Sequence, residues 1–296
     1  KEIFTSYSYR EKEYNYEYRP VLLLSFALEY SAFGVNPHTS HVISILLFAV
    51  FSFLLFYFLR IAFPNANELM IFAGILLFIV HPIHTEVVDN IKSRDDLLCG
   101  IFGISMLIHF QRFLETKKVI KLIFVFLFFL LGFLSKESIT VYAVAIPCLY
   151  LIRMAEEGRS PFRILIPLFG VIVVLAFFKF GKSLVLTEDS FSRGRLYYEN
   201  PMYFAGFGEK IAAGISLSLF YLKLLSWPFE LSYYYGYNQI PMPGWTSALP
   251  YLGLLIYAVL IYVVYKIIRK EKLLAFSILI LLVNLFATNG ILKVMP

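Results

Sequence analysis

Apolar runs alternate with short polar links along almost the whole chain. A membrane-spanning helix needs about 20 mainly apolar residues, and tilt or neighbouring polar turns let somewhat shorter runs cross. Runs of this kind occupy about residues 41–60, 69–80, 97–113, 119–134, 139–152, 162–180, 249–268 and 273–288. The pattern predicts an all-α polytopic membrane protein, a bundle of about eight spans with additional interfacial helices.

The composition agrees with this prediction. Of the 296 residues, 59% are hydrophobic and only 16% are charged, whereas soluble domains have about 25% charged residues. The net charge of +6 reflects basic links between spans, so no nucleic acid partner is expected. Cys99 and Cys148 lie in apolar segments, which indicates small buried residues and no disulfide framework.

Basic residues concentrate in three links and predict the orientation of the chain. These links are 112–121, 153–163 and 266–272. Because cytoplasmic links are enriched in Lys and Arg, we expect these three to be cytoplasmic. The intervening links then face the extracytoplasmic side; they are 81–96, 135–138 and 181–248.

The same pattern divides the chain into four segments. Residues 1–40 are polar and then half-apolar, with an interfacial helix expected to begin at Pro20. A transmembrane core at 41–180, an extracytoplasmic segment at 181–248 and a C-terminal transmembrane hairpin at 249–296 follow. Since segment 181–248 must begin and end on one side, its apolar run 211–227 should be interfacial or re-entrant, and one additional crossing is the alternative.

The link VHPIHTEVVDNIKSRDDLL (80–98) carries an unusual density of polar residues. His81 precedes a proline and should end its span, while Pro82 can open a helical turn. His81, His84 and Glu86 permit three readings: hydrogen bonding to a substrate or acid–base work, a metal site if the turn is irregular, or capping of helix ends with pairing to Arg94.

Arg94 in the second half of this link is suited to binding a phosphate, because guanidinium binds it in a bidentate manner. An Arg–Asp pair that holds the loop and a snorkelling side chain are the alternatives. Ser93 or Asp95 can cap the next span.

Two further polar stretches fall on the same predicted side. Lys136 and Glu137 join two closely spaced spans, where they could bind and orient a phosphate or form a structural ion pair. Tyr237 and Asn238 lie in YYYGYNQIPMPGW, where aromatic faces suit either sugar rings or anchoring at the membrane interface. No Walker motif or nucleophile elbow is present in the sequence.

Four stretches resemble one family closely. They are YEYRPVLLLSFALEYSAFGVNPHTSHVISILL (16–47), HPIHTEVVDNIKSRDDLL (81–98), LLGFLSKES (130–138) and LSYYYGYNQIP (231–241). In this order they resemble the transmembrane O-mannosyltransferases that carry tetratricopeptide repeats, together with their bacterial relatives, in the GT-C superfamily of glycosyltransferases.

This resemblance implies a GT-C-like bundle that moves a sugar from a polyprenyl-phosphate donor to an acceptor hydroxyl on a protein or glycan, with inversion. It implies roles for the residues introduced above. Donor phosphate would be bound by Arg94, Lys136 and Arg19; the catalytic centre would be supported by His81, His84, Glu86 and Asp95; substrate would contact Glu137, Tyr237 and Asn238. Apart from the donor no cofactor is expected, and a divalent metal on His81, His84 and Glu86 stays an alternative.

The resemblance also implies that a first span, most of the first extracytoplasmic loop and a C-terminal part lie outside these residues. The catalytic base is expected in that loop, before Lys1, and is therefore not assigned. The expected location is a bacterial inner membrane with an extracytoplasmic active face, in contact with membrane lipid and within a larger membrane complex. A lipid-linked-sugar transporter and a non-catalytic GT-C-like subunit are the competing interpretations.

Overall fold

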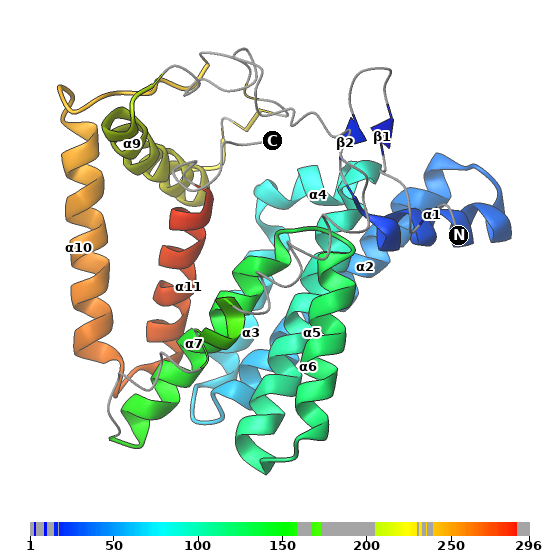
Figure 1. The fold of residues 1–296 in the computed structure, drawn as a ribbon, viewed down its shortest axis with the longest axis horizontal. Coiled ribbons are helices and arrows are strands. Elements are labelled where there is room, and N and C mark those ends of the chain that lie inside the picture. Colours follow the sequence, from blue (N-terminus) through cyan, green and yellow to red (C-terminus); the bar gives the residue numbers. More distant parts are fainter. Residues whose placement is uncertain are drawn as a thin grey trace. The chain divides into compact units, whose positions relative to one another are not determined.

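The computed structural model describes residues 3, 9–10, 15–16, 18–158, 167, 169–172, 205–229, 231–232, 235 and 239–288. Nearly all regular structure in these ranges is helical (Figure 1). The strands β1 (Tyr9–Arg10) and β2 (Asn15–Tyr16) form one short antiparallel pair, with Tyr9 opposite Tyr16. The all-α class predicted from the sequence is confirmed.

The chain forms two compact units, which consist of residues 1–154 with 159–190 and of residues 155–158 with 191–296. The first unit contains α1 (Pro20–Phe33), α2 (Pro37–Ala62), α3 (Glu68–Val80), α4 (Thr85–Asp89), α5 (Arg94–Thr116), α6 (Ile120–Phe133) and most of α7 (Ile139–Glu156), with the 3-10 turns η2 (Pro82–His84) and η3 (Ile91–Ser93). The second contains α9 (Phe207–Ser226), α10 (Leu249–Ile267) and α11 (Lys272–Thr288).

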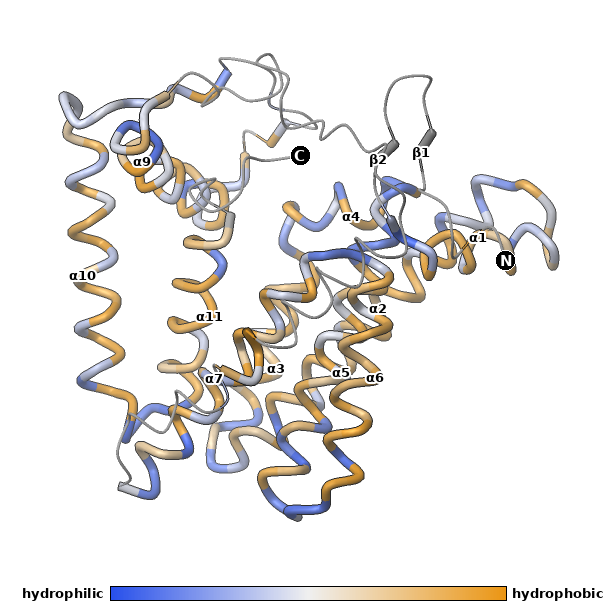
Figure 2. Tube along the Cα trace, in the orientation of Figure 1, coloured by the Kyte–Doolittle hydropathy of each residue, from blue (hydrophilic) through white to orange (hydrophobic). Residues whose placement is uncertain are grey.

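Several helices are long and apolar enough to cross a membrane. In the described ranges these are Pro37–Ala62, Ile91–Thr116, Ile139–Glu156 and Leu249–Ile267. The helices Glu68–Val80 and Pro82–Asp89, which are bent by 52° relative to each other, form a fifth candidate span if they are counted as one. Apolar residues cover the helices and polar residues gather at their ends (Figure 2). Three shorter apolar helices, α1, α6 and α11, accompany them. The chain is a polytopic membrane protein, and the count of about eight spans stays a prediction because most of run 162–180 lies outside the described residues.

Local sequence signals explain where several helices begin and end. Pro20 occupies the first turn of α1, as its fixed φ and missing N–H favour. His81 adopts extended geometry after α3, and Pro82 opens η2. The predicted start at Pro20 and the predicted end at His81 are confirmed. Ser93 is the N-cap residue of α5, although its side chain makes no capping hydrogen bond.

The helix α5 lies at the centre of the first unit. It packs against α6, α2 and α1. Within the apolar window of its span 61% of the residues are buried, against 17% for α2, so α5 forms the core of the first unit while α2 leaves most of its surface exposed. Gly103 on α5 permits the approach of α7, because a Cβ added there would lie 2.6 and 2.8 Å from two ring carbons of Tyr142.

Replacing Gly103 by alanine should therefore destabilise the fold by about 1–3 kcal/mol, as overpacking of a close contact does. The matched control is Gly74→Ala in α3, where no heavy atom lies within 4 Å of the added Cβ and the change should be neutral or slightly stabilising. Thermal unfolding of the two purified variants in detergent measures the difference. Equal midpoints would show that α5 and α7 do not pack as closely as described.

The second unit is built on contacts of α9 with α10 and α11. Gly253 on α10 faces Ile215 on α9, and the hydroxyls of Ser218 and Tyr257 lie 2.8 Å apart. The Trp245 indole N–H donates to the Gly208 carbonyl at 2.9 Å and ties the start of α9 to the segment before α10. The predicted apolar run 211–227 is thus helical, and its interfacial or re-entrant position stays a prediction.

Candidate functional site

The polar link between α3 and α5 does not gather its histidines and glutamate into one site. The Nδ1 atom of His81 accepts a hydrogen bond from the Ile83 N–H at 3.2 Å, which is the capping role considered from the sequence. The His84 ring packs against Phe78, with centroids 4.2 Å apart. Burial, and secondarily the nearby His81, lowers the pKa of His84.

Glu86 lies on the exposed side of α4. Among the residues that the structure describes, no group of three or more His, Cys, Asp or Glu side chains is placed to hold a metal ion. The convergence of His81, His84 and Glu86 that a metal site would require is therefore not formed.

Arg94 belongs to a buried cluster that joins three helices, which we call the arginine cluster. Its Nη2 atom lies 2.5 Å from the Glu29 carboxylate of α1, and its guanidinium carbon lies 4.1 Å from the centroid of the Phe26 ring. The Ser40 hydroxyl of α2 donates to Glu29, and the Ser40 carbonyl accepts from Arg94 at 3.4 Å. The side chains of Arg94 and Glu29 are 1% and 2% exposed.

This environment bears on the donor-phosphate role expected for Arg94, which stays a prediction. A guanidinium enclosed by Glu29, Ser40 and Phe26 is not open to a phosphate, and its observed acidic partner is neither Asp95 nor Glu86. These contacts hold the start of α5 against α1 and α2. One sequence signal was available: a lone carboxylate in the apolar stretch VLLLSFALEYSAF is costly unless it is paired.

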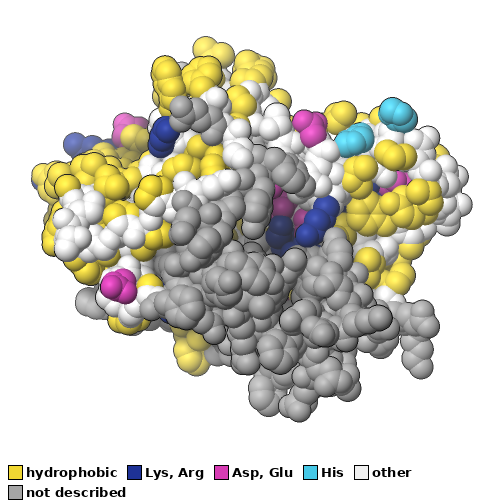
Figure 3. Space-filling model, turned by 90° about the horizontal axis from the view of Figure 1, so that it is seen from above, with side chains coloured by type: hydrophobic (Ala, Val, Ile, Leu, Met, Phe, Trp, Pro, Cys, Tyr) yellow, Lys and Arg dark blue, Asp and Glu magenta, His cyan; other side chains and the backbone are white. Residues whose placement is uncertain are grey.

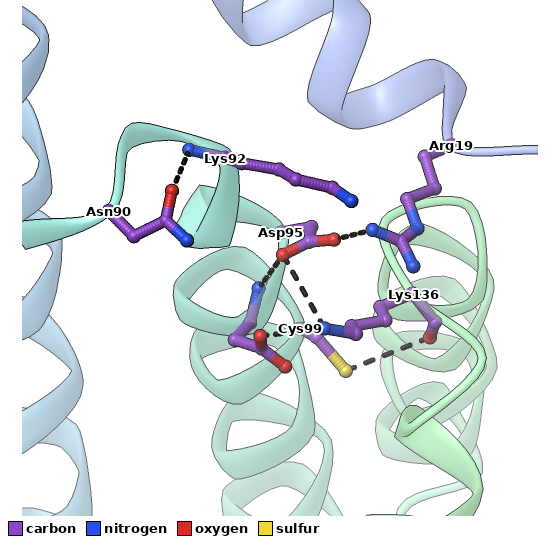
Figure 4. A network of polar contacts seen from close by, with 7 residues as sticks. Arg19, Asn90, Lys92, Asp95, Cys99 and Lys136 are labelled. Atoms are coloured by element: carbon purple, nitrogen blue, oxygen red, sulfur yellow. Dashed lines mark hydrogen bonds and ion pairs between the residues drawn. The ribbon is translucent and has the colours of Figure 1, made fainter. Parts of the chain in front are cut away.

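A second group of charges lies beside the first, at the beginning of α5 (Figure 4). We call it the α5-end cluster, and it consists of Arg19, Lys92, Asp95, Asp96 and Lys136. Arg19 donates to Asp95 Oδ2, while Lys136 Nζ lies 2.6 Å from Asp96 Oδ2 and 3.6 Å from Asp95 Oδ1. Arg19, Asp95 and Lys136, which are far apart in the chain, therefore lie together, and their expected roles stay predictions.

Backbone contacts hold the contributing segments together. The Val21 N–H of α1 donates to the Leu134 carbonyl at the end of α6, at 3.1 Å, and so fixes Arg19 near the α6–α7 link. The Cys99 thiol donates to the Lys136 carbonyl at 3.7 Å. The Asp95 carboxylate accepts from the Asp96 N–H at 2.8 Å, and both acidic groups suit the positive end of the α5 dipole.

Two members of the cluster, Lys92 and Asp96, were not among the site residues expected from the sequence. Asn90 accepts from the Lys92 N–H at 3.1 Å, and the Lys92 side chain extends toward Arg19 and Asp95 (Figure 4). Their presence in KSRDD, next to Asp95, was the available signal. This signal was missed because the turn at η3 decides which side chains of KSRDD face Lys136.

Charge and exposure bear on what the α5-end cluster could bind. Arg19 and Lys136 form ion pairs with Asp95 and Asp96, and the Lys92 side chain extends toward Arg19 and Asp95. Asp95 is 1% exposed, whereas Lys136 is 24% exposed and Asp96 is 36% exposed. Basic and acidic side chains also lie together in a recess of the surface seen in Figure 3. A phosphate could approach Lys136 from the exposed side of the cluster.

The remaining expected site residues lie elsewhere. Glu137 is exposed in the α6–α7 link, next to Lys136 in sequence. Tyr237 and Asn238 lie outside the described residues, so their roles stay predictions.

The fold and this site define an integral membrane protein with a cluster of charged residues at the end of its central helix. Residues 20–180 match the protein family described as dolichyl-phosphate-mannose-protein mannosyltransferase. The match covers more than half of the chain, and the chain belongs to this family. It includes the arginine cluster and every member of the α5-end cluster except Arg19.

Individual relatives agree with the family. The chain is 34% identical to the mouse protein O-mannosyl-transferase TMTC1 over 99 residues, which are 33% of this chain and 10% of the relative. It is 28% identical to the human protein O-mannosyl-transferase TMTC3 over 155 residues, 51% of this chain and 16% of the relative. The matches therefore span a sixth or less of the length of these relatives. No solved structure matches the chain.

Proposed function

We propose that this chain is the membrane part of a glycosyltransferase that moves a sugar from a polyprenyl-phosphate donor to a hydroxyl group of a protein. The observation that carries the proposal is the α5-end cluster, a partly exposed cationic group at the end of a membrane helix. The names of the relatives, protein O-mannosyl-transferases, support a protein acceptor and mannose as the first sugar to test.

The proposed reaction is a direct displacement at the anomeric carbon. The acceptor oxygen forms a bond to this carbon and loses its proton to a base. The bond between the anomeric carbon and the phosphate oxygen breaks, and its electron pair leaves with the polyprenyl phosphate. Lys136, with Arg19 and Lys92 beside it, would stabilise the charge that develops on this oxygen, as positioned cations do where water is scarce.

The two clusters would divide the work between binding and positioning. Asp95 is held by Arg19 and Lys136 and is almost completely buried, so it is suited to fixing the cations. Asp96 is the more exposed carboxylate of the Lys136 pair. The arginine cluster fixes α5 against α1 and α2, which sets the direction of both acidic residues. None of these side chains is proposed as the base.

The proposal includes a location. The basic links favour an extracytoplasmic position for the α5-end cluster, and a bacterial inner membrane is the membrane we propose. Since the donor carries a long isoprenoid, its phosphate would lie at the level of the helix ends, where Lys136 is found.

The test uses the full-length protein reconstituted in sealed proteoliposomes with radiolabelled polyprenyl-phosphate mannose and a Ser/Thr-rich acceptor peptide. We expect one labelled peptide for each polyprenyl phosphate released, with inversion at the anomeric carbon, and no transfer from a nucleotide sugar. Labelling should require the peptide on the side opposite the basic links. Movement of intact labelled donor across the bilayer without peptide labelling would instead identify a transporter and refute the proposal.

A further inference from the structure

The far end of α5 carries a second basic feature that the proposed transfer reaction does not use. At a rise of 1.5 Å per residue, the 23 residues of α5 separate its two ends by about 35 Å, roughly the thickness of a bilayer core. At this end Lys117 and Lys118 are exposed in the turn between α5 and α6, and Lys121 is half-buried in the first turn of α6. We call this group the lysine turn.

The carboxylates near the lysine turn are already paired with arginines. Glu115 lies 3.2 Å from Arg112, and Glu68 lies 3.1 Å from Arg60. Within residues 60–68 and 111–121 these are the two acidic residues in the sequence. The three lysines are therefore not neutralised by the carboxylates of these two segments, and they produce a local positive charge.

The backbone of the lysine turn leaves anion binding to the side chains. At the start of α6 the Lys121 N–H donates to the Lys118 carbonyl at 3.0 Å, and the Leu122 N–H donates to the Val119 carbonyl at 2.8 Å. Lys117, at the end of α5, has φ of 56°. It is the non-glycine residue with positive φ in the part of the chain that the structure describes. Glycine is the usual residue for this conformation, and retention of a strained residue is a reason to look for a function of its side chain.

Apolar side chains next to the lysines indicate where the anion comes from. Val119 is 69% exposed, Ile120 51% and Ile123 59%. Exposed apolar side chains directly beside exposed lysines are typical of a segment at the boundary between headgroups and acyl chains. A free phosphate in water would make no favourable contact with these apolar side chains.

We propose that the lysine turn is a binding site for the phosphate headgroup of an anionic phospholipid. The three lysines bind the phosphate, while Val119, Ile120 and Ile123 contact the acyl chains. This site is separate from the proposed donor site, and it would hold the α5–α6 hairpin at a fixed depth in the membrane.

Titration of the full-length protein in detergent with fluorescent phosphatidylglycerol tests the proposal, with phosphatidylcholine as the neutral reference. Since each lysine near an anionic surface contributes about fivefold in affinity, the triple variant Lys117→Gln, Lys118→Gln, Lys121→Gln should bind phosphatidylglycerol about a hundredfold more weakly. The matched control is Arg60→Gln with Glu68→Gln, which removes an ion pair at the same end without changing its net charge and should leave binding unchanged. Equal binding by the triple variant and the unaltered protein would overturn the proposal.

Two further measurements separate the lipid site from simpler explanations. Lys117→Gly relieves the positive φ, so its thermal midpoint should be unchanged or higher while phosphatidylglycerol binding falls several-fold; a fall in stability with no change in binding would contradict the role of the side chain. Millimolar glycerol phosphate should compete poorly with the lipid. If it displaces the lipid completely, the turn binds soluble phosphates and the assignment to a phospholipid is wrong.

Discussion

Replacing Lys136 by methionine should reduce sugar transfer by about 10²–10³-fold, the usual loss when one group that stabilises developing negative charge is removed. The ammonium group lies 2.6 Å from Asp96 and 3.6 Å from Asp95. The Lys136 side chain is 24% exposed and that of Arg19 is 15% exposed, so Lys136 is the more exposed of these two cations. Methionine keeps the unbranched apolar stem and removes the charge. Initial rates with polyprenyl-phosphate mannose and the acceptor peptide measure the effect.

The fold should survive this substitution. The main chain at Lys136 is held by its N–H, which donates to the Gly132 carbonyl at 2.8 Å, and by its own carbonyl, which accepts from Cys99. Asp95 also retains Arg19 as its partner. Lys136→Arg should recover part of the rate because the charge is restored, and Lys270→Met, at an exposed lysine between α10 and α11, should leave the rate unchanged. A folded Lys136→Met variant with more than a third of the normal rate would remove Lys136 from the proposed mechanism.

Breaking the arginine cluster should have the largest effect on stability. Removal of one partner from a buried ion pair leaves an uncompensated charge and costs about 3–5 kcal/mol. Glu29→Ala would leave Arg94, which is 1% exposed, without its carboxylate partner. Arg94→Ala would leave the Glu29 carboxylate without its guanidinium partner. We expect either variant to lower the free energy of unfolding by this amount, which thermal unfolding in detergent and the yield of folded protein measure.

The double variant Glu29→Gln with Arg94→Met decides what Arg94 does. Replacing both charges avoids the isolated ion, so most of the stability should return. If Arg94 acts only by positioning α5, transfer activity should return as well. A double variant that is stable but inactive would instead show that the guanidinium contacts the donor. Arg60→Gln is the matched surface control, because Arg60 and Glu68 are both more than half exposed and such pairs contribute about 0–1 kcal/mol.

The two clusters also explain why the sequence identified the region more reliably than the individual roles. HPIHTEVVDNIKSRDDLL and LSKES correctly marked the two links that meet at the start of α5. The role of each residue depended on its distance from partners on other helices. Lys136 meets Asp96 across 40 positions of sequence, and Arg19 meets Asp95 across 76. Because ion pairs of this kind have no periodicity in the sequence, Asp96 and Lys92 were missed, and the pairing of Arg94 with Glu29 was not among the alternatives considered for Arg94.

The sequence by itself determined the membrane class, the positions of most helices, the start of α1 at Pro20 and the end of α3 at His81. These features follow from contiguous residues, since hydropathy over a span and the geometry of proline act locally. Only the tertiary structure decided which charges are buried and which remain accessible. The packing of α1 and α2 on α5 enclosed Arg94 with Glu29, while the α6–α7 link left Lys136 partly open. The reason is physical: a charge inside a membrane protein must find a partner, and the partner is selected by which helices are in contact.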